Sequence, residues 1–194
     1  MAAARLRDGA LEGQLIATDF KSLLYWKEHD YPEAGVRDAF GSALIVSADG
    51  HVLLGLQRPG QLNSGFAYLP GGLIDHRDVA TDGSIDIGQS VARELAEETG
   101  LIAADVARRP GFLLTLHGAL ASIAVVYRVP QSSEQLVAAV RRHIAADAEP
   151  ELEDVAVICG PVDLASTRLA PYARVLLTAL YAGDPALAGV LAGA

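Results

Sequence analysis

Three glutamates fall close together near the middle of the chain, in the segment RELAEETGL that runs from Arg93 to Leu101. Residues three and four apart share one face of an α-helix, so Glu94, Glu97 and Glu98 would lie within an arc of roughly 100° and repel one another. An ion pair from Arg93 to Glu97 would relieve only one of these charges. The cluster therefore needs an explanation.

Two explanations fit. A solvent-exposed helix face is where most glutamates belong. Alternatively, a divalent cation could neutralise the carboxylates, because Mg²⁺ takes oxygen ligands and is often bound by a few carboxylates plus substrate phosphates. The upstream turn LPGG, residues 69–72, favours the cation, since a glycine turn exposes carbonyl oxygens and lets a phosphate approach the backbone.

Together, LPGG and ARELAEETGL resemble the signature of the Nudix (MutT-like) hydrolases, G-x5-E-x7-R-E-U-x-E-E-x-G-U, in which U is aliphatic. The second half is matched at every defined position. The first half departs from the signature, because the 20 residues between Gly72 and Arg93 are about seven more than the signature has. This implies an insertion within Leu73–Ser84. Counting back from Arg93 places the first signature Glu on the uncharged Ile85. The partner of Arg93 therefore stays open among Asp75, Asp78, Asp82 and Asp86.

The resemblance implies that Glu94, Glu97 and Glu98 are ligands of Mg²⁺ or Mn²⁺, with Glu94 and Glu98 as the inner pair. The carbonyl of Gly71 or Gly72 would add to the shell. Family members hydrolyse a nucleoside diphosphate linked to another moiety. The implied function is a metal-dependent pyrophosphohydrolase acting on a small nucleoside diphosphate derivative, with the ADP-ribose or nucleotide-sugar type favoured. The alternatives are a Nudix-like sensor that binds a nucleotide without hydrolysing it, and an isomerase of isoprenoid diphosphates.

Such hydrolysis also requires a general base. Relatives carry it within the signature or on a later loop, so the resemblance implies a catalytic set of Glu97, Glu98, Glu151, Glu153 and Arg93. The segment AEPELEDVAVI that holds Glu151 and Glu153 could equally be ordinary loop surface. The substrate-binding set is Arg58, Gly71 and Gly72. For Arg58, a strand-end arginine in solvent is the alternative.

Composition limits the classes of function. A net charge of −9 argues against nucleic acid as a partner, because phosphate binding requires clustered Lys and Arg. No uncharged run reaches the roughly 18 residues of a bilayer span, and the start does not resemble a secretory signal. We therefore expect a cytoplasmic protein with no membrane partner. The single cysteine, Cys159 in VAVICG, excludes an internal disulfide and is expected to be a buried strand residue.

The elements that must position these residues alternate between strands and helices. Strands are expected at 39–47 and 51–58, joined by the turn ADG, and a second pair at 111–118 and 120–129. A further strand is expected at 154–159. Helices are expected at 88–99, ended by Gly100, and at 132–148 and 170–183. The segment 73–86 is expected to be an exposed loop.

This order predicts an α/β fold, a mixed sheet between helices, which agrees with the Nudix fold that the resemblance implies. We expect a Nudix hydrolase domain at residues 36–194. Residues 1–35 would form an N-terminal extension packed on it, with possible substrate contacts or homodimer contacts.

Overall fold

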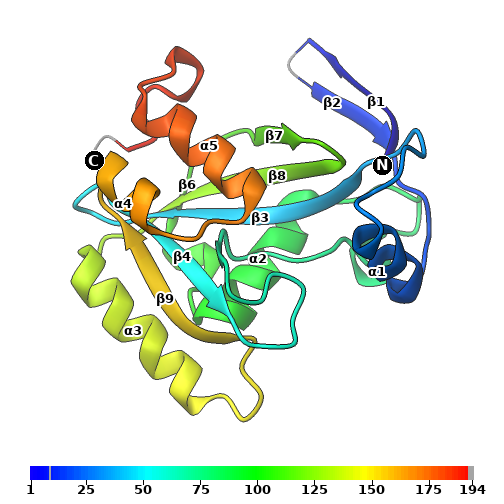
Figure 1. Cartoon of the computed structure of the whole chain (residues 1–194). Helices are drawn as coiled ribbons and strands as arrows, with labels where there is room; N and C mark the ends of the chain where they lie inside the picture. The colour runs from blue at the N-terminus through cyan, green and yellow to red at the C-terminus, as the bar shows by residue number, and fades with distance from the viewer. Residues whose placement is uncertain (9, 192–194) are drawn as a thin grey trace.

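A mixed sheet of seven strands forms the centre of the molecule (Figure 1). The structure is a computed structural model that describes residues 1–8 and 10–191. β3 and β8 run parallel over nine residue pairs, and the other strand pairings of this sheet are antiparallel. Both predicted hairpins are confirmed. The strands are β3 (Asp38–Val46), β4 (Val52–Gln57), β5 (Ala67–Tyr68), β6 (Ala107–Arg108), β7 (Leu113–His117), β8 (Leu120–Arg128) and β9 (Leu152–Ile158).

Helices cover both faces of the sheet. Helices α2 (Ile87–Thr99) and α3 (Ser133–Ala146) lie on one face, and α4 (Pro161–Ser166) and α5 (Pro171–Tyr181) lie on the other (Figure 1). The apolar sides of these layers meet in one core, whose fully buried members include Leu44, Leu54, Leu95, Val125 and Leu177. The predicted α/β sandwich is therefore confirmed. No helix in the described part of the chain has the length and apolarity that crossing a membrane demands.

Local signals in the sequence set the limits of α2. Asp86 caps its start by accepting a hydrogen bond from the backbone N–H of Gln89 at 3.1 Å. Gly100 ends it in a left-handed conformation, with φ of 73°, which a glycine adopts without a steric penalty. The predicted helix and its glycine stop are thus confirmed, and the start lies one residue earlier than expected.

The edge of β3 positions the glycine turn. β4 pairs with β3 at Ile45 and Val46. Beside the earlier residues of β3, the glycine turn takes the position of a neighbouring strand. There the backbone N–H of Ala43 donates to the Pro70 carbonyl at 2.6 Å, and that of Gly41 donates to the Gly72 carbonyl at 3.2 Å. A Cβ on Gly71 would lie 2.2 Å from the Gly41 oxygen. Only glycine allows this approach.

The N-terminal segment contributes a hairpin and a helix. β1 (Ala2–Arg7) and β2 (Ala10–Gln14) form a separate two-stranded sheet that projects away from α1 (Phe20–Glu28), which lies below it in Figure 1. The Lys27 ammonium on α1 donates a hydrogen bond to the Leu62 carbonyl, which ties the helix to the loop between β4 and β5. The division at residue 35 and the possible dimer contacts of the extension stay predictions.

One local prediction is wrong and another is incomplete. Cys159 is exposed, because β9 ends one residue before it and its backbone N–H turns to the Asp163 carboxylate at 2.8 Å. The segment 73–86 is not simply an exposed loop. It contains a turn of 3₁₀ helix, His76–Asp78, and a bridge between Val79 and Ile85.

Candidate active site

The three clustered glutamates of α2 have different environments. Glu94 and Glu98 are buried, with 8% and 4% of their surface exposed. The Glu97 side chain is 53% exposed. The solvated-face explanation therefore holds for Glu97 at most, whereas two carboxylates point into the protein, where an unpaired negative charge is costly.

Glu98 is held at the glycine turn by two donors. The Tyr68 hydroxyl donates to one carboxylate oxygen at 2.6 Å, and the backbone N–H of Gly71 donates to the other at 3.2 Å. Burial raises the pKa of Glu98 well above its usual value, an effect that these two hydrogen bonds reduce. Tyr68 itself is buried on β5. No part of the signature marks this position, so the contact of Tyr68 with Glu98 could not be predicted from the sequence.

Glu94 lies against the next glycine. A Cβ on Gly72 would sit 2.5 Å from the Glu94 carboxyl carbon, so a side chain there would occupy the space that the carboxylate needs. Burial is the largest cause that raises the pKa of Glu94, and the charges of Glu97 and Glu151 raise it further. The Arg93 guanidinium, 2.5 Å from Glu94, opposes this rise.

Asp78 is the principal partner of Arg93. Its two carboxylate oxygens lie 3.0 and 3.2 Å from the Arg93 Nη2, and its side chain is only 4% exposed. The same carboxylate accepts hydrogen bonds from the Ser90 hydroxyl at 3.1 Å and the Asp75 backbone at 3.0 Å. Arg93 also reaches Glu97, at 3.5 Å. The loop folds back, which selects one of the four acids that the sequence left open.

The position of Asp78 also locates the insertion. Counted forward from Gly72, the signature spacing G-x5-E falls on Asp78. The extra residues are therefore 79–85, closed at their base by the Val79–Ile85 bridge and by the Ala80 N–H, which donates to the Ser84 carbonyl at 2.8 Å. Counting back from Arg93 stopped at Ile85, the last residue of the insertion, and so did not reach Asp78. Counting forward would have found the acid.

The later acidic loop brings one of its two candidates to the site. The charge of Glu151 raises the pKa of both Glu94 and Glu98, so it lies within electrostatic reach of them. Glu153 is exposed on β9. Arg58 is exposed just after β4 and does not line the cavity; its guanidinium donates to the Pro150 carbonyl at 3.2 Å and its N–H to the Glu151 carbonyl at 3.0 Å. It therefore fixes the loop that carries Glu151.

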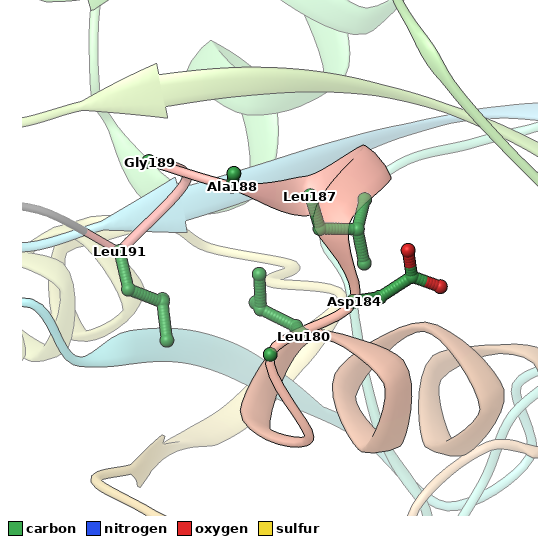
Figure 2. A pocket seen from close by; sticks show the side chains of 7 residues that line it. Leu180, Asp184, Leu187, Ala188, Gly189 and Leu191 are labelled. Atoms are coloured by element: carbon green, nitrogen blue, oxygen red, sulfur yellow. The ribbon is translucent and has the colours of Figure 1, made fainter.

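Two cavities differ in their relation to these residues. One of about 240 Å³ adjoins Tyr68, Gly71 and Gly72. The other, of about 150 Å³, is shown in Figure 2 and lies between the end of α5 and the segment that follows it. Its one charged residue, Asp184, already accepts a hydrogen bond from the Ala186 N–H at 2.9 Å. The first cavity is the one that belongs to the site.

A family model described as the NUDIX domain matches residues 36–180. The chain belongs to the Nudix family. A bifunctional NMN adenylyltransferase/ADP ribose pyrophosphatase from Francisella tularensis has the same fold, with a TM-score of 0.54 and 17% identity over 82% of this chain and 45% of that chain. This Nudix chain thus spans less than half of that bifunctional protein. RenU, a Nudix hydrolase from M. smegmatis, has a TM-score of 0.53 and 18% identity over 77% of this chain and 88% of that chain. No curated protein matches the chain.

The donor set of this Nudix domain fits a hard cation that keeps other ligands. Within residues 1–8 and 10–191, no group of three His, Cys, Asp or Glu side chains is arranged to hold a metal by itself. Mg²⁺ does not need one, because it commonly binds through one or two carboxylates, several waters and the phosphates of a substrate. The buried carboxylates of Glu94 and Glu98 provide the negative charge that such a cation would neutralise.

Proposed function

We propose that this protein is a metal-dependent pyrophosphohydrolase that cleaves a nucleoside diphosphate linked to another moiety, of the ADP-ribose or nucleotide-sugar type. Nudix hydrolases generally use divalent metals, and Mg²⁺ or Mn²⁺ is the cofactor we propose here. One observation carries the proposal: two buried carboxylates of α2, Glu94 and Glu98, meet the Gly71–Gly72 turn beside a cavity.

Each residue has a separate task in this proposal. Glu94 and Glu98 hold the cation, which supplies charge neutralisation for the diphosphate and lowers the pKa of water. A glycine carbonyl adds an oxygen ligand, and we favour that of Gly71 because the Gly72 carbonyl already accepts a hydrogen bond from β3. Tyr68 orients the Glu98 carboxylate through its hydroxyl.

Arg93 and Asp78 act through their contacts with Glu94 and with each other. The Asp78 carboxylate binds the Arg93 Nη2, while the Arg93 Nη1 lies 2.5 Å from Glu94, where its charge favours the ionised form of that carboxylate. Glu94 therefore keeps negative charge for a cation. We propose Glu151 as the general base in preference to Glu153 or Glu97, because it carries a charge that acts on both buried glutamates and follows a loop anchored by Arg58.

A substrate screen with matched variants tests the proposal. Wild-type protein is assayed against ADP-ribose, nucleotide sugars, dinucleotides and nucleoside triphosphates, with and without Mg²⁺. We expect turnover of a diphosphate-bridged substrate that requires the metal, and loss of kcat by a factor of roughly 100 or more in Glu98→Gln. Glu134→Gln, an exposed acid at the start of α3, removes the same charge and should retain activity. Tight nucleotide binding without turnover by wild type would refute hydrolysis and favour a sensor.

A further inference from the structure

The cavity beside the glycine turn is built from aromatic side chains. Five of its lining residues are aromatic, namely Tyr31, Phe40, Phe66, Tyr68 and Tyr172. Its volume of about 240 Å³ is below the roughly 300–1,000 Å³ of sites that enclose a whole drug-sized ligand. Aromatic side chains stack on the flat face of any nucleobase. The cavity thus suits one planar ring system, not an entire dinucleotide.

The carboxylate of Asp38 also lines this cavity. Asp38 opens β3, and its backbone N–H donates to the Ala119 carbonyl at 2.8 Å. Its side chain is partly buried, yet among the residues that the structure describes none donates a hydrogen bond to it or forms a salt bridge with it. Burial raises the pKa of Asp38, and the more weakly felt charges of the Met1 amino group and Lys27 oppose this. The carboxylate can therefore accept a hydrogen bond from a ligand that enters the cavity.

The N-terminal segment contributes Lys27 and Tyr31 to the cavity lining, and Tyr31 lies in strained backbone. Asp30 and Tyr31 adopt left-handed conformations, with φ of 57° and 52°, which non-glycine residues rarely do. Trp26 holds this turn. Its ring packs edge-on against Tyr31 at 5.0 Å between centroids, and its carbonyl accepts the Tyr31 N–H at 2.9 Å. Strained backbone of this kind concentrates at ligand-binding sites, and here it sets a tyrosine into the cavity wall.

We propose that this cavity binds the base of the substrate, that the base is a purine with an exocyclic amino group, and that Asp38 accepts a hydrogen bond from that group. The inference rests on the proposed function, which places the diphosphate at the adjoining Gly71–Gly72 turn. An ionised carboxylate only accepts hydrogen bonds, so it favours an amino group. It would face repulsion from the two carbonyl oxygens that flank the ring N–H of uracil. Lys27, which also lines the cavity, is a donor for a ring nitrogen.

Trp26 allows the test to be made without hydrolysis. It is the single tryptophan of the chain and contacts Tyr31, so its fluorescence reports occupation of the cavity. The probes are AMP, UMP and purine riboside 5′-monophosphate, which is AMP without the amino group. A hydrogen bond to a charged partner changes affinity by roughly 10–100-fold. We therefore expect AMP to bind 10–100-fold more tightly than purine riboside 5′-monophosphate, and UMP to bind more weakly than AMP.

Variants then assign the preference to one residue. Asp38→Ala should reduce the affinity for AMP to that for purine riboside 5′-monophosphate, and should leave the latter affinity nearly unchanged. Asp38→Asn keeps the side-chain shape should the alanine variant fold poorly, and should reduce the AMP advantage at least threefold. Glu28→Ala removes an exposed acid from the same N-terminal segment and should change neither affinity.

The outcomes separate this inference from the proposed function. Equal binding of AMP and purine riboside 5′-monophosphate by wild type overturns the inference, and so does an AMP advantage that persists in Asp38→Ala and Asp38→Asn. Either result can coexist with metal-dependent hydrolysis that Glu98→Gln abolishes. Conversely, an Asp38-dependent preference for AMP in a protein without hydrolytic activity would retain the base site and reject the proposed function.

Discussion

In this chain Asp78 stands where the signature has its first Glu. Replacing Asp78 with asparagine tests whether its carboxylate stabilises Arg93. The carboxylate lies 3.0 and 3.2 Å from the Arg93 Nη2 and accepts a further hydrogen bond from Ser90 at 3.1 Å. The Asp78 side chain is 4% exposed and the Arg93 side chain is 21% exposed. The pair is therefore largely shielded from water, and loss of one charge leaves the other poorly solvated.

The expected loss of stability follows from this burial. Breaking a buried ion pair costs roughly 3–5 kcal/mol, because the remaining charge keeps its desolvation penalty without its partner. Arg93 keeps contacts with Glu94 and Glu97 and is partly hydrated, so the lower end, about 3 kcal/mol, applies. In a domain of this size, that loss lowers Tm by roughly 6–12 °C.

Thermal unfolding followed by circular dichroism measures this change. The matched control is Asp82→Asn, which removes the same charge from an exposed residue of the insertion and should leave Tm unchanged within error. Arg93 should also turn more fully to Glu94 in Asp78→Asn and raise the Mg²⁺ concentration needed for activity. Equal Tm values for the two variants would refute the role of Asp78 as the partner of Arg93.

Three further changes probe the site. Gly72→Ala puts a methyl group where the Glu94 carboxylate lies, so it should raise the Mg²⁺ concentration needed for activity with little change in Tm. Gly71→Ala puts a methyl group against the backbone of β3 and should lower Tm markedly. A larger loss of Tm in Gly72→Ala than in Gly71→Ala would contradict these contacts. Tyr68→Phe removes the donor that orients Glu98, and calorimetry should show Mn²⁺ binding weakened by roughly 10–100-fold. Unchanged affinity would exclude a positioning role. Burial raises the pKa of both buried glutamates, so their contribution to stability is present at low pH and is lost as pH rises through the raised pKa. Because Mg²⁺ binds the ionised carboxylates, it should raise Tm more at pH 8 than at pH 5, and equal shifts would contradict the site.

Helices and hairpins that depend on a local sequence pattern could be predicted. The α2 helix follows from its apolar spacing and its stop at Gly100, and the two hairpins follow from β-rich runs joined by turns. The buried state of Glu94 and Glu98 also has a sequence signal, because the glycine turn and the signature acids occur together. The different exposure of Glu97 does not, since it depends on where the turn meets the helix.

Contacts that depend on how separate segments pack together could not be predicted from the sequence. Asp78 stands at the signature spacing from Gly72 and was one of four candidates, but its pairing with Arg93 depends on the closure of the insertion at Val79 and Ile85, which no local propensity specifies. Asp38 and Tyr31 come to one cavity through the packing of the N-terminal segment, which no motif marks. For Cys159 a local pattern misled, because its apolar neighbours predicted a strand that includes it, whereas β9 ends one residue before it.

Anomalous diffraction from crystals soaked in MnCl₂ with a non-hydrolysable ADP-ribose analogue tests the central claim most directly. That claim is that the buried carboxylates of α2 hold a divalent cation against a diphosphate. We predict a manganese peak bonded to Glu94 and Glu98, with phosphate oxygens of the analogue completing the coordination. A fully occupied analogue with no manganese at either glutamate would contradict it.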